Sequence, residues 1–371
     1  MKYDLAVVGA GIVGLAHALA GVRRGLRVVV LEREARANGA SVRNFGFITV
    51  NGQEAGLTRA RALRSREVWE DVAREAGINV LQRGSIFVAQ RPEAMAVLEE
   101  YAASPEGEEC EVRDAAASRQ AVPQLGANVQ GALFSPREMR IEARDALPAI
   151  AAWLEECHGV VFSWGNATLD IEEGGRIRHA HGTVEADAIV VAPGTGTAEF
   201  SPRIAKDAQL RQCTLQMLRL ADPGWRLPGV VLGDLSLLRY GGMAAQPSLA
   251  KLRARVEREC AAEIAEGVHL IVAQSADGSL VIGDSHRYAD HALPFASARL
   301  DALIVGQLHA LLDIPDTPVV ERWLGHYAVA NVKPMVREEL GARARLVTVT
   351  NGLGMSTAFA IGEETIAELF G

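Results

Sequence analysis

Three glycines and one glutamate near the N-terminal end of the chain have the residue types and the spacing that bind a dinucleotide. Gly9, Gly11 and Gly14 form a Gly-x-Gly-x-x-Gly motif, and Glu32 follows at the end of an apolar run. The first glycine of such a motif permits a tight turn, the second lets a pyrophosphate approach the backbone, and the third lets a helix pack closely on a strand. A carboxylate at the position of Glu32 accepts hydrogen bonds from ribose hydroxyls and repels a 2′-phosphate. The pattern therefore predicts a dinucleotide other than NADP.

A strand, a turn and a helix must position these residues. Residues 3–8 predict a buried strand, the motif opens a helix that ends near residue 24, and residues 27–31 predict a second buried strand. The N-terminus of that helix presents free N–H groups and the positive end of a dipole to the phosphates. A purely structural glycine-rich loop would leave Glu32 unexplained. The predicted nucleotide contacts are Gly9, Gly11, Ile12, Val13, Gly14, Glu32 and Arg33.

The segment that follows favours FAD over NAD. An NAD dehydrogenase would continue with further strand–helix units, whereas residues 33–53 are polar and contain glycines, with little periodicity. Such a loop can cover a cofactor that extends beyond its pyrophosphate. Within it, residues 41–46, Ser-Val-Arg-Asn-Phe-Gly, resemble the flavin-proximal segment of the D-amino acid oxidase superfamily, whose members use FAD. The resemblance implies cofactor contacts from Ser41, Arg43, Asn44, Gly46 and Phe47.

Two later turns extend this resemblance. An apolar strand that reaches Gly194 resembles the second nucleotide-side loop of the superfamily, which assigns Ala192 and Gly194 to the cofactor site. Residues 351–358, NGLGMSTA, resemble its C-terminal flavin motif, in which the last helix points its N-terminus at the flavin. The matching positions are Gly352, Gly354, Met355 and Ser356. A positive helix end there would stabilise an anionic reduced flavin, although the same residues could form a helix that only packs.

The expected substrate-binding strand departs from the amino acid oxidases of the superfamily. Those enzymes carry a Trp-x-Gly-x-Arg-Pro pattern whose arginine binds the substrate carboxylate. Here Trp323 and Gly325 match, but Tyr327 stands in place of the arginine. Without a planar guanidinium that forms paired hydrogen bonds, an ordinary amino acid should be a poor substrate. Some members attach FAD through a cysteine near this region, and because the nearest cysteine here is Cys260, we expect non-covalent FAD.

Four strings of residues resemble one bacterial subgroup of the superfamily, the FAD-dependent oxidoreductases associated with aminophosphonate breakdown. These strings are residues 84–90, 238–249, 277–288 and 322–328. The resemblance implies a phosphonate in place of the carboxylate. A phosphonate has three acceptor oxygens, so several separate donors can replace one guanidinium fork. The predicted substrate-binding residues are Arg239, Tyr240, His286, His326, Tyr327 and Lys333.

His286 follows a Gly-Asp pair, residues 283–284, that invites a different interpretation. Flavin-dependent hydroxylases carry a Gly-Asp turn late in the chain, but the glycine-rich helix start that should follow Pro294 is missing. The C-terminal motif already supplies the glycine turn and helix start expected at the flavin edge. We therefore interpret residues 277–290 as a substrate-domain strand whose end faces the flavin. His286 then either donates to an anionic substrate or is a hydrogen-bonded structural residue.

These resemblances imply a flavin-dependent amine oxidoreductase. A neutral amine transfers hydride to the flavin, the imine hydrolyses, and O2 or another acceptor reoxidises the flavin, with H2O2 as the product from O2. We expect 2-aminoethylphosphonate or its N-methyl form to give phosphonoacetaldehyde plus ammonia or methylamine, without a catalytic side chain. The alternatives are an oxidase of the glycine, sarcosine or D-amino acid type with a carboxylate substrate, a flavin-dependent hydroxylase, an amine dehydrogenase and a non-catalytic flavin-binding module.

Composition and charge limit the partners and the compartment. The 371 residues include 38 Lys and Arg against 46 Asp and Glu, so the net charge is 38 − 46 = −8, and no basic block indicates nucleic acid. The four cysteines are isolated, without a C-x-x-C pair, which predicts a reducing cytoplasm and no metal site. Residues 5–22 contain no Lys, Arg, Asp or Glu, but a strand–turn–helix explains them better than a membrane span. The oligomeric state stays open.

The order of expected elements predicts an α/β fold. A Rossmann-like FAD-binding domain is interleaved with an α+β substrate domain built on a mixed antiparallel sheet, as in D-amino acid oxidase and glycine oxidase. Expected helices include residues 57–76, 92–103, 143–157 and 250–262. The predicted FAD-binding domain comprises residues 1–80, 138–205 and 322–371, and the predicted substrate domain comprises residues 81–137 and 206–321.

Overall fold

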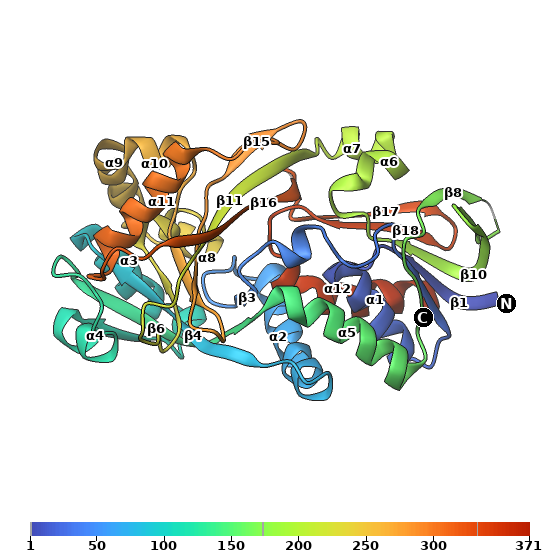
Figure 1. The fold of residues 1–371 in the computed structure, drawn as a ribbon, viewed down its shortest axis with the longest axis horizontal. Coiled ribbons are helices and arrows are strands. Elements are labelled where there is room, and N and C mark those ends of the chain that lie inside the picture. Colours follow the sequence, from blue (N-terminus) through green and yellow to red (C-terminus); the bar gives the residue numbers. More distant parts are fainter. Residues whose placement is uncertain (1, 173, 332) are drawn as a thin grey trace.

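The computed structural model describes residues 2–172, 174–331 and 333–371. Two lobes lie side by side along the long axis, each built on one sheet (Figure 1). The lobe on the right of Figure 1 contains both chain ends. Among the described helices, none is both long and apolar enough to cross a membrane.

The first lobe contains a largely parallel sheet. Within the described residues its order is β17-β18-β10-β1-β2-β7, and the hairpin β8–β9 extends it from β10. All neighbours along this order pair in parallel except β17 and β18. The strands are β1 Lys2–Val8, β2 Val28–Leu31, β7 Val161–Ser163, β8 Thr168–Glu172, β9 Arg176–His179, β10 Gly182–Val191, β17 Met335–Gly341 and β18 Ala344–Val349. Residues 5–8 and 28–31 are buried, as continuous apolar runs in a parallel sheet require.

The longer helices described in the first lobe pack beside its sheet. They are α1 Ile12–Arg23, α2 Leu57–Glu75, α5 Ala143–His158 and α12 Gly354–Phe370. The fully buried Trp69 joins α2 to α12: its Nε1 donates to the carbonyl oxygen of Met355 at 2.7 Å, and its ring meets Phe359 edge to face at 5.0 Å. These contacts fix the N-terminal turn of α12. Two short helices, α6 Thr197–Phe200 and α7 Pro202–Asp207, follow β10.

The second lobe contains a mixed, mainly antiparallel sheet. Within the described residues its order is β15-β11-β14-β13-β12-β4-β6-β3, with β16 on β11 and β5 on β6, and only β12 and β4 pair in parallel. The strands are β3 Phe47–Ile48, β4 Val80–Ala89, β5 Glu111–Asp114, β6 Gly131–Ile141, β11 Arg211–Leu220, β12 Val230–Leu232, β13 Ile271–Gln274, β14 Leu280–Gly283, β15 Arg287–Ala289 and β16 Val319–Val329. Its helices are α3 Pro92–Ala102, α4 Ala115–Ala121, α8 Gly241–Ala244, α9 Leu249–Glu259, α10 Ala261–Ala265 and α11 Ala298–Leu311.

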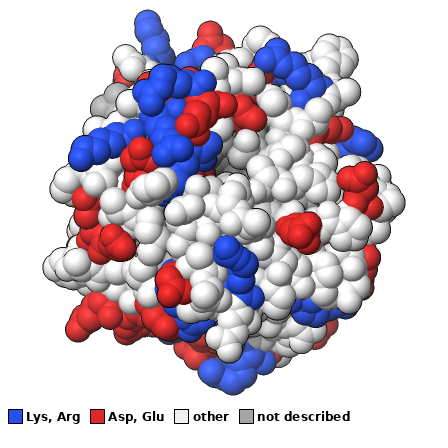
Figure 2. Space-filling model, turned by 90° about the vertical axis from the view of Figure 1, so that its left-hand side faces the viewer, with Lys and Arg blue, Asp and Glu red and all other residues white. Residues whose placement is uncertain are grey.

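The outer end of the second lobe carries charges of both signs. Figure 2 looks onto this end and shows basic and acidic side chains close together beside an uncharged area. Arg255 on α9 lies 2.8 Å from both Glu93 and Glu259. Such partly exposed pairs contribute little stability each, but they leave this end without a surface of one sign.

The chain passes between the lobes several times. β3 follows the N-terminal part of the first lobe and pairs with β6, whereas β16 pairs with β11 before the chain returns to β17 and β18. The predicted α/β fold, with a Rossmann-like part interleaved with a mixed-sheet part, is confirmed. The domain boundaries stay predictions, and residues 322–329, predicted for the FAD-binding domain, pair with the second sheet as part of β16.

Candidate cofactor and substrate site

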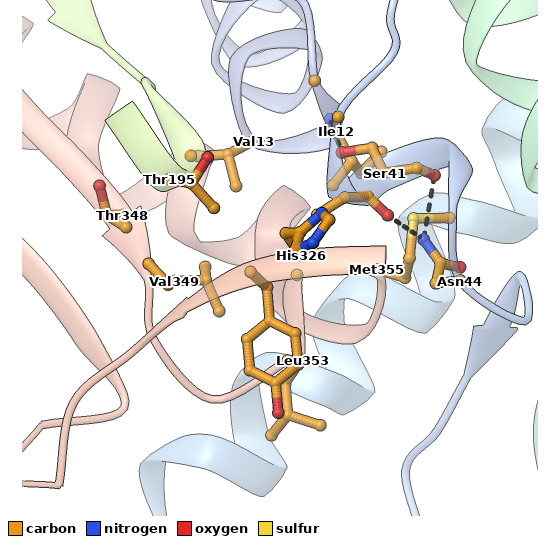
Figure 3. Close-up of a pocket in the computed structure, with 18 of the residues that line it drawn as sticks. Ile12, Val13, Ser41, Asn44, Thr195, His326, Thr348, Val349, Leu353 and Met355 are labelled. Atoms are coloured by element: carbon orange, nitrogen blue, oxygen red, sulfur yellow. Dashed lines mark hydrogen bonds between the residues drawn. The ribbon is translucent and has the colours of Figure 1, made fainter. Parts of the chain in front are cut away.

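One cavity of about 760 Å³ is lined by residues of both lobes. Most residues predicted for the cofactor and the substrate lie in its wall. These are Gly9, Gly11, Ile12, Val13, Glu32, Arg33, Ser41, Arg43, Asn44, Phe47, Ala192, Gly194, Arg239, Tyr240, His286, His326, Tyr327, Gly352, Gly354, Met355 and Ser356. The cavity thus joins segments that are far apart in the sequence, and Figure 3 shows Ile12, Ser41, His326 and Met355 around a shared space.

The turn between β1 and α1 forms the nucleotide end of the cavity. Gly9 has φ +102°, and a Cβ on it would lie 2.5 Å from the carbonyl oxygen of Ala192, so only glycine fits there. The carboxylate of Glu32 accepts from Ala10 N at 2.8 Å, which holds it at the end of β2. Gly11, the N-cap residue of α1, has no side chain that could cap the helix, and although Ile12 N donates to Ser41 Oγ, the other N–H groups of the first turn can bind a phosphate. This arrangement fits the adenosine diphosphate part of FAD.

The loop after β2 is held by its own side chains. Asn44 Nδ2 donates to the carbonyl oxygens of Ala40 and Ser41 at 2.9 and 3.0 Å (Figure 3). Ser41 Oγ accepts from Ile12 N at 2.9 Å, which ties the loop to the start of α1. Trp323 on β16 donates from Nε1 to the carbonyl oxygen of Arg43 at 3.1 Å. The loop predicted to lie beside the flavin is therefore fixed by both lobes.

The C-terminal motif brings α12 to the same cavity. Gly352 has φ +77°, and a Cβ on it would lie 3.3 Å from the ring carbon Cζ of Tyr327. Ser356 Oγ accepts from Thr49 N at 2.9 Å. The side chain of Leu353, the N-cap residue of α12, makes no cap hydrogen bond, and Asn351 Oδ1 accepts from Leu353 N at 3.1 Å. Because this N-terminal turn opens into the cavity, the positive end of the helix faces the space where a flavin would lie.

Three predicted site residues are not among the described residues that line the cavity. Gly14 and Gly46 lie behind the wall: a Cβ on Gly14 would be 1.8 Å from the carbonyl oxygen of Gly9, and one on Gly46 would be 1.9 Å from that of Ile141. Their role in the structure is close packing. Lys333 is exposed, and its Nζ lies 3.4 Å from Glu338 Oε1.

The substrate end of the cavity contains a guanidinium and several ring side chains. Arg239 follows the turn Asp234–Leu238 and donates from Nη2 to the hydroxyl oxygen of Tyr288 at 2.8 Å. His326 places Nε2 3.2 Å from the carbonyl oxygen of Leu293. Burial raises the pKa of Tyr327 well above its ordinary value. Tyr327 is therefore a neutral hydroxyl group beside Arg239 at neutral pH.

The cavity wall also contains a cluster of three titratable side chains, His269, Asp284 and His286. Of these, only His286 was predicted from the sequence. Asp284 lies 3.2 Å from His269 and 3.8 Å from His286, measured from its carboxylate oxygens to each Nε2. Burial raises the pKa of Asp284 to about 7, although Arg239 acts against this, and burial lowers the pKa of His286 to about 3. The Gly-Asp pair was the available signal, but it was interpreted only as the end of a strand.

The fold and the cavity define a class of protein. A Rossmann-like sheet, a Gly-x-Gly-x-x-Gly turn, a carboxylate at the end of β2 and the N-terminus of α12 all meet at one cavity. Residues 4–368 match the model of the family described as DAO, FAD dependent oxidoreductase. The chain belongs to this family, which confirms the predicted enzyme class and FAD as the cofactor.

Individual relatives are more distant. The chain is 24% identical to glycine oxidase of Geobacillus kaustophilus (strain HTA426) over 217 residues, 55% of this chain and 57% of that protein. The match therefore spans little more than half of the curated relative. Crystal structures of glycine oxidase from Geobacillus kaustophilus (TM-score 0.76, 18% identity, 99% of this chain and 94% of that chain) and from Bacillus cereus ATCC 14579 (TM-score 0.79, 17% identity, 99% and 97%) are similar in fold. So is iminodiacetate oxidase from Chelativorans sp. BNC1 (TM-score 0.75, 15% identity, 98% and 95%).

Proposed function

We propose that the protein oxidises a small anionic amine, preferably 2-aminoethylphosphonate or its N-methyl form, to phosphonoacetaldehyde plus ammonia or methylamine. FAD, when bound, supplies a two-electron acceptor for the C–H bond beside the nitrogen, and its reoxidation by O2 yields H2O2. Two of the similar proteins are named as oxidases of glycine and of iminodiacetate, which supports an amine as the donor. The sequence strings that resemble the aminophosphonate subgroup support the phosphonate.

The observation that carries the substrate class is the position of the guanidinium. Tyr327 on β16 occupies the place of the arginine in the Trp-x-Gly-x-Arg-Pro pattern, and Arg239 lines the cavity from another element. The bond to Tyr288 uses one N–H of Arg239, which leaves further donors for an anion. A phosphonate presents three oxygens in different directions, so Arg239 and the neutral hydroxyl of Tyr327 can each bind one.

The remaining residues orient the reacting groups. The fixed loop at Ser41 and Asn44, together with the N-terminus of α12, binds the cofactor from two sides of the cavity. The helix end favours negative charge on the cofactor when the substrate is oxidised. Arg239 holds the anionic end of the substrate, so the amine end is directed away from the guanidinium. Orientation and exclusion of water are the contributions of this chain to the rate.

Anaerobic bleaching of the bound flavin tests the proposal. The purified FAD-loaded protein is mixed with glycine, sarcosine, D-alanine, 2-aminoethylphosphonate and N-methyl-2-aminoethylphosphonate, and absorbance of the oxidised flavin is followed. We expect bleaching by the aminophosphonates, and H2O2 and phosphonoacetaldehyde on admission of air. No bleaching by either aminophosphonate would refute the substrate. Bleaching that needs NAD(P)H would indicate a hydroxylase, and bleaching by the aminophosphonates without H2O2 in air would indicate a dehydrogenase.

A carboxylate substrate is the second candidate. The similarity to glycine oxidase and the match of Trp323 and Gly325 to the amino acid oxidase pattern favour it. In that case Arg239 would take over the role of the missing arginine. Efficient bleaching by glycine, sarcosine or D-alanine would select this candidate.

A further inference from the structure

We propose that His269, Asp284 and His286 bind one divalent transition-metal ion, and that this ion, together with Arg239, binds the anionic group of the substrate. The first part depends only on the three side chains. The second part rests on the proposed function, because it requires an anionic substrate in the same cavity.

The contacts of the two Nδ1 atoms determine the state of the two Nε2 atoms, which both lie near Asp284. Nδ1 of His286 lies 3.1 Å from the carbonyl oxygen of Gly267, a group that only accepts, so this nitrogen carries the proton. Nδ1 of His269 lies 3.0 Å from Ser236 Oγ, and the same hydroxyl lies 3.0 Å from the carbonyl oxygen of Leu270. When the hydroxyl donates to Leu270, Nδ1 of His269 is a donor as well, and this is the tautomer that the proposal requires. Both Nε2 atoms are then left with lone pairs, which is the state in which a histidine binds a metal.

Asp284 adds a third acceptor without a donor of its own. Its side chain is 7% exposed, and Oδ1 has no hydrogen-bond partner among the described residues. Oδ1 lies 3.2 Å from His269 Nε2, which is an acceptor when the ring proton is on Nδ1. Two acceptors at this distance repel each other unless a positive group lies between them. The cluster is thus complementary to a cation.

The distances suit a metal ion after a small adjustment. All three ligand atoms lie within 4.8 Å of one another. In a tetrahedral site with bonds of about 2.0–2.2 Å, ligand atoms are roughly 3.3 Å apart. The 3.2 Å from Oδ1 of Asp284 to His269 Nε2 already matches, whereas His286 Nε2 lies 3.8 Å from the other carboxylate oxygen, Oδ2, so a modest shift of its ring or a rotation of the carboxylate is required. Two imidazoles and one carboxylate are ligands that Zn²⁺ and related ions accept, with a position left open toward the cavity.

The ion would supply the positive charge that is needed to bind a doubly charged anion. Without it, the positive charge of Arg239 and the negative charge of an ionised Asp284 cancel, so the wall cannot neutralise a doubly charged phosphonate. Buried charges need partners of opposite sign. A doubly charged ion restores this balance, and an oxygen of the anion can occupy its open position.

A shared proton is the competing explanation. It would satisfy the contact between Asp284 and His269. The other titratable or charged groups near Asp284 are Arg239, Cys213, Tyr240 and His286. However, one proton adds only a single charge, and a proton between Asp284 Oδ1 and His269 Nε2 leaves Oδ2 and His286 Nε2, 3.8 Å apart, without a cation between them.

The test measures metal content before any activity. The FAD-loaded protein is prepared without a polyhistidine tag, analysed by elemental mass spectrometry, stripped with a soluble chelator, and titrated with Zn²⁺ and Co²⁺. We expect one ion per chain, and for Co²⁺ absorption bands at longer wavelength than those of oxidised flavin. Asp284→Asn and His286→Gln should each weaken Zn²⁺ binding by at least tenfold. His326→Gln is the matched control, since His326 lines the same cavity outside the cluster, and its metal binding should be unchanged.

The second part is tested with ethylphosphonate, which lacks the amine. Its binding to the metal-loaded and the stripped protein is followed through the flavin spectrum, and we expect at least tenfold weaker binding after stripping. Absence of a stoichiometric ion in the wild-type protein, or equal Zn²⁺ binding by Asp284→Asn, would overturn the metal site. Ethylphosphonate binding that is unaffected by stripping, or that proceeds with proton uptake and no metal, would overturn the role of the ion. Since metal binding needs no turnover, a failed substrate panel with a bound ion would refute only the proposed function.

Discussion

Arg239 should control the affinity for the anionic end of the substrate. Arg239→Ala removes the guanidinium that lines the cavity and leaves the hydroxyl of Tyr288 without its donor at 2.8 Å. Loss of a charged donor to a bound anion costs about 1.5–3 kcal/mol, which is roughly a 10- to 150-fold decrease in kcat/KM. Arg239→Lys keeps the charge but not the planar arrangement of donors, so we expect a smaller decrease. Bound FAD should be retained in both variants, because Arg239 belongs to the second lobe, away from the nucleotide end.

The assay separates binding from chemistry. The rate of anaerobic flavin reduction is measured against the concentration of 2-aminoethylphosphonate, or of whichever amine bleaches the flavin, and ethylphosphonate binding is measured in parallel. Arg211→Ala is the matched control: Arg211 donates to the carbonyl oxygen of Tyr288 at 2.9 Å but is not among the described residues that line the cavity. We expect that control to lie within about twofold of the wild type. Wild-type binding of ethylphosphonate by Arg239→Ala would refute the reasoning.

Four further predictions concern the cofactor, the substrate and the core. Gly11→Val should abolish FAD retention, because a Cβ there lies 3.1 Å from Ser41 Oγ and faces the approach of the pyrophosphate; a yellow variant with stoichiometric FAD would contradict this. Acid or heat should release all flavin from the wild-type protein, since no cysteine is among the described residues of the cavity wall, and flavin left on the precipitated chain would disprove it. Glycine, sarcosine and D-alanine should bleach the flavin poorly, because Tyr327 replaces the expected arginine; rapid bleaching by any of them at micromolar concentration would count against that alignment. Trp69→Phe should lower the free energy of unfolding in denaturant by about 1–3 kcal/mol, because the buried carbonyl of Met355 loses its donor; an unchanged midpoint would remove Trp69 as the clamp on α12.

Local features of the fold were readable from the sequence because local chemistry determines them. Gly9 has a positive φ and leaves no room for a Cβ beside Ala192, which is what the glycine motif predicts. The apolar spacing predicted a helix at residues 57–76, and the helix lies at Leu57–Glu75. The segment 41–46 forms its loop through side-chain bonds between near neighbours, such as Asn44 to Ser41. Such features can be recognised from a short stretch of sequence.

The cluster around Asp284 could not be found in this way. His269 and Asp284 lie just beyond the paired ends of β13 and β14, where each residue donates its N–H to the carbonyl of the other at 3.2 and 3.0 Å. Strand register is a property of the whole sheet and has no short motif. Lys333 is a different case: it is close to Tyr327 in sequence, but it is exposed, it is not among the described residues that line the cavity, and its Nζ lies 3.4 Å from Glu338 Oε1. Its role toward the substrate stays a prediction.

The position of β18 and α12 in the first lobe has a consequence for the order of events during synthesis. β18 pairs with β10, and α12 packs on α1 and α2, although residues 344–370 are translated more than 300 residues after the Gly-x-Gly-x-x-Gly turn. Nascent chains form their structure from the N-terminal side first. The second lobe can therefore assemble on the ribosome while the first still lacks a sheet strand and its C-terminal helix. FAD capture must then wait until β18 and α12 have emerged, so the supply of free flavin matters late in synthesis, long after the Gly-x-Gly-x-x-Gly turn has been made.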